Sequence, residues 1–478
     1  MLTCKEDNYQ YRCEGKNKSG STLYWICLDH KKFKCSARVH TDADHNHKTS
    51  KGEHIHPSTV ASTGSSRAMK KMTNEAKEPG QARTAMQIVA DNLQGLPDSV
   101  LNKMPDEKSI AKKLQSYLSK EHKDIPHSRT GYDIPEQYAN IQEYNENGEK
   151  WGIYKFLQFD SGKEDEDRML LFATERGLEN LREYKTWACD GTFKSANENW
   201  YQLFSVHGVL HKSRSAPCGY VLLPNKKETT YIDLFKCLDT MLGTKPTEVL
   251  CDFEKGLMNA IKTCFPDAKV SNCNWHFCEN VYRKVKNLGY QTEYNTNPEF
   301  ANALNKLKAL AFLPCDCVVR GYELLEDEIG HILPKELFDY FEENYIGELK
   351  GRGKNQRRLL PLFLIEHWNV YDRLKNDRPR TNNLVEGFNS GFSKLLGQAK
   401  PNLWKLIDNM KKYEGIAKKR VLEFKHGKIP SGKSDYEKLN KKYKNILADF
   451  DHKREDNKGD VDDKLIKETL ELVADLMH

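Results

Sequence analysis

The chain has 478 residues, of which 38% are hydrophobic and 30% charged, and its formal net charge is +6 at pH 7. That length allows two or three domains with a core each, and the composition is typical of a soluble globular protein and excludes a fibrous or wholly disordered chain. Residues 1–7 become charged before any apolar run forms, so no signal peptide is expected. The longest apolar run, 359–365, is far shorter than the roughly 20 residues of a membrane-spanning helix.

Two further features of the composition indicate where the protein works. The 13 cysteines are an odd number spread over a long chain, which favours a reducing, intracellular compartment with thiols that are buried or bind metal. Residues 1–130 hold 22 Lys and Arg against 15 Asp and Glu, a charge of +7, so the remainder of the chain is about −1. This distribution fits a DNA-facing N-terminal quarter, and before motifs are considered it fits an ordinary solvated surface equally well.

The N-terminal segment 1–58 contains a candidate zinc shell. Cys27 ends a β-rich run, Cys35 follows it, and His54 and His56 stand in the phrase Gly-Glu-His-Ile-His-Pro. Two thiolates and two imidazoles complete a tetrahedral zinc site, and so short a segment needs such a staple because it cannot bury a large core. The segment resembles a FLYWCH zinc finger, a small β-rich module, and the resemblance implies that these four residues bind Zn²⁺.

Several other residues of this segment have alternative interpretations. His45 and His47 form a second His-x-His pair, but the FLYWCH pattern ends in the phrase that holds the later pair. Cys4 and Cys13 are expected to be packing residues. Four basic residues are expected either to contact DNA phosphates or to form a solvated face, namely Lys31, Lys32, Lys34 and Arg38.

A linker and a helical unit are expected next. Residues 59–82 are polar, with a run of Ser and Thr and then Lys and Glu, which is typical of a flexible linker. Residues 83–149 begin with apolar residues at helical spacing, and a turn followed by a helix-start signal interrupts them at 95–99. We interpret this small basic unit either as a helix-turn-helix-like, DNA-contacting unit or as a helical spacer.

From residue 150 the order of elements predicts an α/β domain. Strands are expected at 186–189, 201–211, 216–223, 247–251 and 268–271, and helices at 229–242 and 254–265. Three strands, a helix, a strand, a helix and a strand are the order of the ribonuclease H-like fold, in which helices flank a mixed central sheet. We therefore expect residues 150–276 to form the first part of such a core.

Three acidic residues are candidates for a catalytic metal site. Asp190 and Asp252 each follow a predicted strand, and in a ribonuclease H-like sheet these strands are neighbours, so both carboxylates are expected at one end of the sheet. Glu386 stands one turn into a helix that opens at Thr381. Two divalent ions about 3.5–4 Å apart assist phosphodiester cleavage, and Mg²⁺ and Mn²⁺ prefer oxygen ligands. Taken singly, each residue also fits a turn, a helix cap or a complement to a helix dipole.

Four phrases resemble the transposases of Mutator-like elements, the MULE group. They are Asp-Gly-Thr-Phe from Asp190, Asp-Phe-Glu from Asp252, Asn-Cys-Asn-Trp-His ending at His276, and Thr-Asn-Asn-x-x-Glu-Gly-Phe-Asn around Glu386. The resemblance covers about 150–425. It implies a DDE transposase core in which Asp190, Asp252 and Glu386 form the catalytic triad and bind Mg²⁺ or Mn²⁺.

The same resemblance implies the remaining organisation and the partners. Residues 277–380 correspond to the helical insertion of these enzymes and 381–425 to the last part of the core. A polar tail, 426–478, follows, with a helical pattern only near its end. The expected partner is double-stranded DNA with terminal inverted repeats, bound by a homo-oligomer, and the expected location is the nucleus.

Cys273 and His276 match a Cys-x-x-His signature of the MULE group. We expect them to support the metal site structurally. Direct contact with DNA or the catalytic ions is one alternative, and a second zinc shell with Cys315 and Cys317 is another.

The basic loop at 349–358 is a further candidate DNA contact. Its residues Arg352, Arg357 and Arg358 are expected to grip DNA phosphates, to serve as a nuclear address, or to be merely solvated.

Two functions follow from these features. The first is a transposase that cleaves DNA at element ends and joins the strands elsewhere. The second is a domesticated transposase that keeps the fold and the finger and acts as a DNA-binding transcriptional regulator without catalysis. All three carboxylates stand in their phrases, which favours the enzyme.

Overall fold

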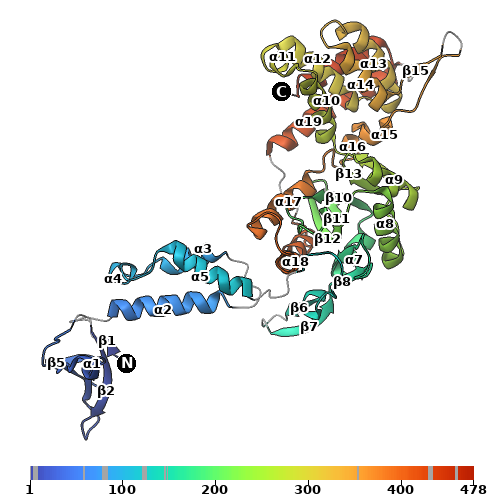
Figure 1. Ribbon diagram of the computed structural model, residues 1–478. Coiled ribbons are helices and arrows are strands. Elements are labelled where there is room, and N and C mark those ends of the chain that lie inside the picture. The colour runs from blue at the N-terminus through green and yellow to red at the C-terminus, as the bar shows by residue number, and fades with distance from the viewer. Residues whose placement is uncertain are drawn as a thin grey trace. The chain divides into compact units, whose positions relative to one another are not determined.

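The computed structural model describes residues 2–3, 9–56, 60–77, 84–120, 126–144, 147, 149–351, 355–428, 434–457 and 461–477. These residues form two compact units, Met1–Ile125 and Pro126–His478, which we describe separately (Figure 1). Among the described residues, none of the helices has the length and apolar character needed to cross a membrane. Cys4 and Arg352 lie outside the described residues, as do 57–59 and 78–83 of the expected linker.

A five-stranded antiparallel sheet opens the first unit. Its strands follow the order of the chain: β1 (Leu2–Thr3), β2 (Gln10–Lys16), β3 (Leu23–Cys27), β4 (Arg38–Thr41) and β5 (His47–Lys51), with the short helix α1 (His30–Phe33) between β3 and β4. Six residues form its small core: Tyr11, Trp25, Cys27, Cys35, Ala37 and Val39. Cys13 was expected to be a packing residue, but it is exposed because β2 runs beyond this core.

Four helices complete the first unit: α2 (Val60–Glu75), α3 (Ala85–Leu93), α4 (Asp98–Leu101) and α5 (Glu107–Lys120). Helix α2 occupies most of the segment that composition predicted to be a flexible linker. Its small residues allow close packing, since a Cβ atom on Gly64 would lie 2.7 Å from Val100 of α4. Apolar residues on α2, including Ala68 and Met72, join a shared core with α3 and α5. The segment is therefore a packed helix, although its Ser-rich composition predicted a linker.

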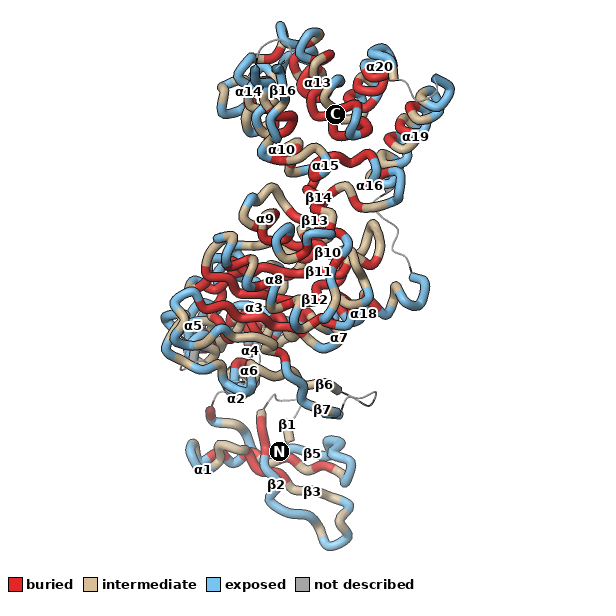
Figure 2. The backbone as a smooth tube through the Cα atoms, turned by 90° about the vertical axis from the view of Figure 1, so that its right-hand side faces the viewer, coloured by how far each residue is buried: buried red, intermediate tan, exposed pale blue. Residues whose placement is uncertain are grey.

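A mixed sheet of seven strands lies at the centre of the second unit. The spatial order is β14-β13-β10-β11-β12-β9-β8, in which β10, β13 and β14 are parallel and the other neighbours are antiparallel. The strands are β8 (Leu157–Asp160), β9 (Leu170–Phe172), β10 (Thr186–Thr192), β11 (Gln202–His211), β12 (Arg214–Leu223), β13 (Glu248–Cys251) and β14 (Lys269–Asn272). Figure 2 shows that the central strands are buried along most of their length. The protein is therefore a mixed α/β structure with a small antiparallel sheet ahead of a larger mixed one.

Helices cover both faces of this sheet. Alternate strand residues such as Trp187, Cys189 and Val249 pack with α7 (Glu175–Glu183), α8 (Glu228–Leu242) and α9 (Lys255–Cys264). On the other face, Tyr220 and His207 contact rings of α17 (Asn383–Leu396), and α18 (Leu403–Lys425) lies beside it. Because side chains alternate along a strand, Asp190 and Asp252 lie on this second face.

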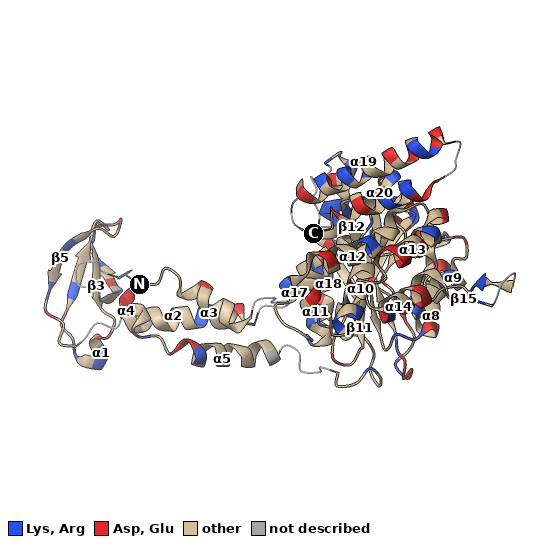
Figure 3. Cartoon of the chain, turned by 90° about the horizontal axis from the view of Figure 1, so that it is seen from above, with Lys and Arg blue, Asp and Glu red and all other residues tan. Residues whose placement is uncertain are grey.

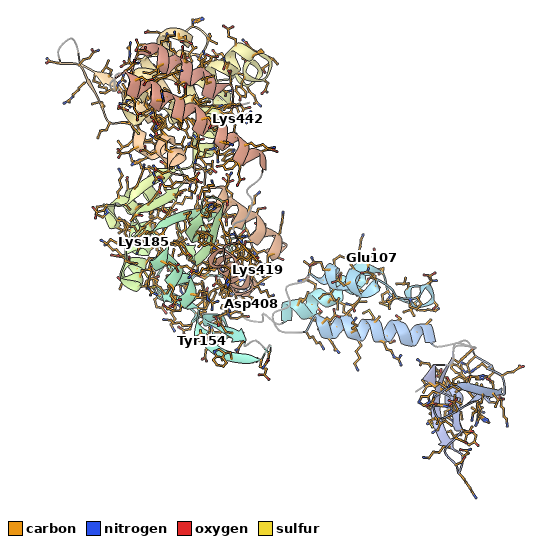
Figure 4. All side chains as sticks on the ribbon, turned by 180° about the vertical axis from the view of Figure 1, so that it is seen from behind. Glu107, Tyr154, Lys185, Asp408, Lys419 and Lys442 are labelled. Carbon is orange, nitrogen blue, oxygen red and sulfur yellow. The ribbon has the colours of Figure 1, made fainter. Side chains whose placement is uncertain are left out.

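The segment before the sheet carries a separate hairpin. It consists of α6 (Glu136–Ala139), β6 (Asn140–Tyr144) and β7 (Lys150–Lys155). Tyr154 projects from β7, and Asp408 and Lys419 lie on α18 (Figure 4). The second unit begins at Pro126, ahead of the boundary expected at 150.

A mostly helical insertion separates β14 from α17. Its elements are α10 (Asn274–Asn287), α11 (Gln291–Thr296), α12 (Pro298–Ala309), η1 (Leu310–Phe312), α13 (Cys315–Ile329), α14 (Lys335–Phe341), the π-helix η2 (Glu342–Ile346), α15 (Ile365–Trp368) and α16 (Tyr371–Lys375). A short antiparallel hairpin, β15 (Leu349–Lys350) and β16 (Arg357–Arg358), interrupts the helices.

The polar tail folds back onto this insertion. Helix α19 (Ser434–Asp456) buries Tyr443, Leu447 and Phe450, and α20 (Asp463–Ala474) packs against α12 and α13. The buried residues of α19 stand at intervals of about one helical turn and form a narrow apolar stripe. The sequence around this stripe is so polar that no helix was predicted there. The tail is therefore part of the inserted helical layer.

Candidate metal centres

Strand pairing brings Asp190 and Asp252 together. Trp187 pairs with Val249 and Ala188 with Leu250 in the parallel ladder of β10 and β13. Each acidic residue lies two positions beyond the last of these pairs, and neighbouring strands are about 4.8 Å apart. The two carboxylates therefore lie side by side, although Asp190 is inside β10 rather than after it, because β10 continues to Thr192 along β11.

Hydrogen bonds hold the Asp190 carboxylate in place. The Gly191 backbone N–H donates to its Oδ1 at 2.7 Å, and the Asn389 side-chain amide of α17 donates to its Oδ2 at 2.7 Å. A Cβ atom on Gly191 would lie 1.9 Å from the Gln202 side chain, which explains why glycine follows Asp190. Burial, followed by the charge of Asp252, raises the pKa of Asp190 to about 7.

The start of α17 anchors Glu386 beside the same strands. The Asn382 backbone N–H donates to the Cys273 sulfur at 3.2 Å, and the Asn382 side chain donates to the Cys189 carbonyl at 3.3 Å. These bonds attach the first turn of α17 to the sheet, and Glu386 lies in that turn. Burial, and to a lesser extent the charge of Asp252, raises the pKa of Glu386.

His276 stands between Asp252 and Glu386. Its Nδ1 is 2.8 Å from Asp252 Oδ1, and its Nε2 is 4.0 Å from Glu386 Oε1. Burial disfavours the charged ring, but close contacts with Asp252 and Cys273 outweigh it and raise the pKa of His276 to about 10. His276, for which the Cys-x-x-His signature suggested a supporting role, therefore lies beside two of the three carboxylates, those of Asp252 and Glu386.

The acidic cluster has the chemistry of a site for divalent cations. Asp252 Oδ1 and Glu386 Oε1 are buried and have no aligned hydrogen-bond partner among the described residues. Burial of these single oxygen atoms is unfavourable unless a positive charge lies nearby, and a bound cation would supply such a charge in addition to His276. Three carboxylates from β10, the end of β13 and α17 can thus hold Mg²⁺ or Mn²⁺ through oxygen atoms.

A pocket of about 920 Å³ opens next to Glu386. Its lining combines the half-exposed ring of Trp275, Tyr436 of α19 and the basic residues Lys212 and Lys441. Aromatic faces and ammonium groups are the features that bind a nucleic-acid strand through base stacking and phosphate contacts.

The first unit holds the other metal centre. The ligand atoms of Cys27, Cys35, His54 and His56 lie within 4.8 Å of one another. Cys27 Sγ is 3.4 Å from His56 Nε2, and Cys35 Sγ is 3.4 Å from His54 Nδ1. Burial, and to a lesser extent the charge of the nearby Cys35, raises the pKa of Cys27 to about 11.

Aromatic residues orient the two histidines. Tyr11 Oη is 2.7 Å from His54 Nε2, the nitrogen opposite the one that faces Cys35, and the Tyr9 hydroxyl donates to the His56 carbonyl. The ring of Phe33 stacks on His56 with centroids 4.6 Å apart. Such outer contacts fix the ring orientation of metal-binding histidines. These tyrosines were assigned no role from the sequence, and both stand well before Cys27, Tyr11 in β2 of the same sheet and Tyr9 just ahead of that strand.

The predicted DNA contacts fall into two groups. Lys31, Lys32 and Lys34 are exposed, whereas Arg38 is half-buried and pairs with Glu14 at 3.2 Å. In the β15–β16 hairpin, Arg357 is exposed.

Arg358 is structural in this conformation. Its guanidinium is paired with Glu323 at 2.9 Å and Glu342 at 2.7 Å, and it donates to the Gly347 carbonyl. Arg358 was expected to face DNA, but both of its terminal nitrogens are hydrogen-bonded within the insertion. The candidate Arg352 lies outside the described residues.

The expected alternative was a zinc shell that joins Cys273 and His276 to Cys315 and Cys317. Among the described residues, the potential ligands near Cys273 and His276 are completed by Asp252 and not by Cys315 or Cys317. Asn389 is a further site residue that sequence reasoning left without a role. Its spacing of three residues from Glu386 places both on one side of α17.

Two segments of the chain match known family models. Residues 6–56 match the FLYWCH zinc finger domain, and residues 186–280 match the MULE transposase domain. No curated protein matches the chain. The transposase match includes Asp190, Asp252, Cys273 and His276, and Glu386 lies beyond it. The FLYWCH match and the Cys/His cluster together support a structural zinc ion in the first unit.

Proposed function

We propose that this chain, which carries a FLYWCH zinc finger domain and a MULE transposase domain, is a metal-dependent DNA transposase with Asp190, Asp252 and Glu386 as its catalytic carboxylates. The observation that carries the proposal is the convergence of these three residues from β10, β13 and α17 on one face and one end of the sheet. The Asn389–Asp190 hydrogen bond of 2.7 Å joins α17, and with it Glu386, to the first carboxylate.

The arrangement of strands supports a ribonuclease H-like reading of the core. The strands β10, β11 and β12 form an antiparallel meander, and β13 and β14 are added in parallel on the other side of β10. The helices α8 and α9 provide the two parallel crossovers, so the order of elements agrees with the one expected for that fold. The strands β8 and β9 extend the sheet beyond β12.

The residues of the site are proposed to bind divalent ions and to hold them beside the DNA phosphate. Bound divalent ions would supply an activated water and charge stabilisation at the attacking and leaving oxygens of a phosphodiester. Asp190 loses its proton when it becomes a ligand, since its pKa of about 7 leaves it partly protonated near neutral pH otherwise. Asp252 lies between its two partners, with Asp190 on one side and His276 on the other. The Trp275 pocket beside Glu386 provides the surface along which a strand can approach the cluster.

The first unit is proposed to bind the DNA that the core cuts. Three exposed lysines lie on and beside α1, where Figure 3 shows basic residues on the finger, namely Lys31, Lys32 and Lys34. Lysines in this arrangement bind phosphates without reading sequence. The substrate is proposed to be double-stranded DNA with terminal inverted repeats, held by a homo-oligomer in the nucleus.

A second candidate function is a DNA-binding transcriptional regulator without catalysis. It is favoured by one observation, that the finger and the helices α2 to α5 form a compact unit of their own. Such a unit can bind DNA whatever the state of the acidic cluster.

A cleavage assay separates the two functions. The full chain is incubated with DNA that carries candidate terminal repeats, in Mg²⁺ or Mn²⁺, beside the variants Asp190→Asn, Asp252→Asn and Glu386→Gln. Asp233→Asn is the matched control, because Asp233 is an exposed residue of α8. Strand cleavage by the parent and the control, and its loss in all three variants, is expected. DNA binding without metal-dependent cleavage by the parent supports the regulator, and equal cleavage by parent and variants overturns the catalytic assignment.

A further inference from the structure

We propose that Asp252, Cys273 and His276 form a second binding site for a thiophilic divalent cation of the Zn²⁺ class, next to the three-carboxylate cluster and sharing Asp252 with it. The carboxylate oxygen, the thiol sulfur and the imidazole nitrogen all lie within 4.8 Å of one another. Zinc bonds of about 2.0–2.3 Å require ligand atoms only slightly closer together than that.

The backbone builds this grouping from neighbouring elements. Cys251 of β13 pairs with Asn272 of β14, so the next residues, Asp252 and Cys273, stand opposite each other where the two parallel strands end. Cys273 is also the residue before α10, and His276 lies in the first turn of that helix. The Cys-x-x-His spacing therefore brings the sulfur and the ring to the same side, facing Asp252.

Asp252 and His276 form an ion pair whose atoms are not aligned as in an ordinary hydrogen bond. Asp252 Oδ1 and His276 Nδ1 are 2.8 Å apart, yet within the described part of the chain neither makes an aligned hydrogen bond. Two ligand atoms that face a common point rather than one another have this geometry. A cation at that point would bind both, and it would take the place of the proton on Nδ1.

Cys273 is prepared for a ligand role by its surroundings. The residue is 2% exposed, and its sulfur accepts a 3.2 Å hydrogen bond from the Asn382 backbone N–H. This hydrogen bond fixes the position of the sulfur beside the first turn of α17. The Asn272 side chain donates to the Asp252 carbonyl at 3.1 Å and so fixes the loop that carries the third ligand.

The donor set selects the class of cation. Mg²⁺ binds oxygen ligands and waters, whereas thiolate and imidazole ligands favour Zn²⁺ and, as a spectroscopic substitute, Co²⁺. Three protein ligands leave one coordination position open, in contrast to the complete four-ligand shell of the finger.

A regulatory consequence rests on the proposed catalytic function. Asp252 cannot serve both sites fully at once, so a zinc-class ion held by Cys273 and His276 withdraws one carboxylate from the catalytic cluster. Zn²⁺ is therefore expected to inhibit cleavage in Mg²⁺, and the Cys273→Ser variant is expected to resist that inhibition.

Cobalt absorption tests the site without reference to catalysis. The full chain, purified with zinc in its finger, is titrated with Co²⁺, and sulfur-to-cobalt charge-transfer absorption is followed in the parent and in Cys273→Ser. The parent is expected to show a component that Cys273→Ser lacks, because any exchange at the finger contributes equally to both proteins. Cys237→Ser is the matched control, since this thiol of α8 belongs to neither group of potential ligands found among the described residues.

A second variant guards against loss of folding. His276→Gln keeps the thiol, and its apparent Co²⁺ affinity is expected to fall by more than about tenfold, the smallest effect that loss of even an outer contact produces. Thermal unfolding of each variant confirms that it is folded. Identical absorption in the parent and in folded Cys273→Ser overturns the proposal and leaves His276 as a residue that only positions Asp252. Cobalt binding without any cleavage would overturn the catalytic function and leave this site standing.

Discussion

Asn389 and Asp190, which are 199 residues apart in sequence, are joined by a 2.7 Å hydrogen bond from the amide of the first to Oδ2 of the second. The bond connects α17 to β10 one helical turn after Glu386. It therefore couples the position of the third carboxylate to that of the first, across the whole length of the helical insertion.

Replacing Asn389 is expected to weaken metal binding. In Asn389→Ala, Asp190 loses a hydrogen bond worth about 1.5–3 kcal/mol because its acceptor is charged. Loss of such an outer contact lowers metal affinity or activity about 10- to 100-fold. Mn²⁺ titration followed by electron paramagnetic resonance measures the affinity, and the Ser390→Ala variant of the same helix is the control. An unchanged Mn²⁺ affinity in Asn389→Ala would show that the bond does not organise the site.

Removal of zinc is expected to unfold the finger and leave the second unit folded. The finger core consists of six residues, so its stability depends on the four ligands, whereas the mixed sheet has an extensive core of its own. Hydrogen exchange in the presence of a strong chelator should show protection lost in β2 to β5 and kept in β10 to β14. Cys27→Ser should have the same effect without chelator. Protection of β3 that persists in both experiments contradicts a structural metal.

The stability of the second unit is expected to fall on mild acidification because of buried His207. Burial, followed by the charge of Arg420, lowers the pKa of His207 to about 3, and its ring nitrogens lie 3.0 and 3.3 Å from the hydroxyls of Ser205 and Ser215. In the unfolded chain this histidine has an ordinary pKa of about 6.5. Below that pH it is protonated in the unfolded chain but stays neutral in the folded protein. This contribution to stability is present above pH 6.5 and is lost as the pH falls toward 3.

Comparison with His207→Gln isolates this effect. Between pH 6 and 4 the parent should lose up to roughly 1.4 kcal/mol per pH unit more than the variant, measured by denaturant unfolding. Carboxylates elsewhere titrate equally in both proteins and cancel. Parallel stability curves for the two proteins would mean that His207 is not buried in its neutral form.

The two adjacent arginines of β16 are expected to behave differently. Arg358→Ala leaves Glu342 without this ion pair and Glu323 with Arg320 alone, so the insertion should lose about 1–3 kcal/mol of stability. Arg357→Ala removes an exposed charge and should leave the unfolding temperature within error while weakening DNA binding in low salt. Thermal unfolding and a salt series of binding assays measure the two effects. An equal loss of stability in both variants would contradict the distinction.

The sequence predicted the elements that surround the site better than those that complete the fold. The strands near Asp190 and Asp252 are apolar runs with clear turn signals, and the predicted order from β10 to β14 agrees with the structure. Glu386 could be placed only through its phrase, because the insertion separates it from the sheet. The bonds made by Asn382 and Asn389 depend on tertiary contact and leave no periodic signal.

Composition was a poor guide where small or charged residues pack. Helix α2 was expected to be linker because Ser, Thr and Gly dominate its first turns, yet Gly64 permits close contact with Val100. Arg358 was predicted to be exposed like its neighbours, because the sequence around a charged residue does not indicate which residues it pairs with. In both cases the outcome depends on which residues pack against the segment in the folded protein. A single sequence does not contain that information.

The packing of α20 against α12 has a consequence for biosynthesis. The inserted helices leave the ribosome well before the residues that cover them, since α20 spans Asp463–Ala474 and is the last helix that the structure describes. Until α20 is made, the apolar side of α12, which includes Leu304 and Leu307, is not covered by that helix. The nascent chain therefore carries an open hydrophobic surface from the synthesis of α12 until α20 docks, and chaperones can recognise it in that interval.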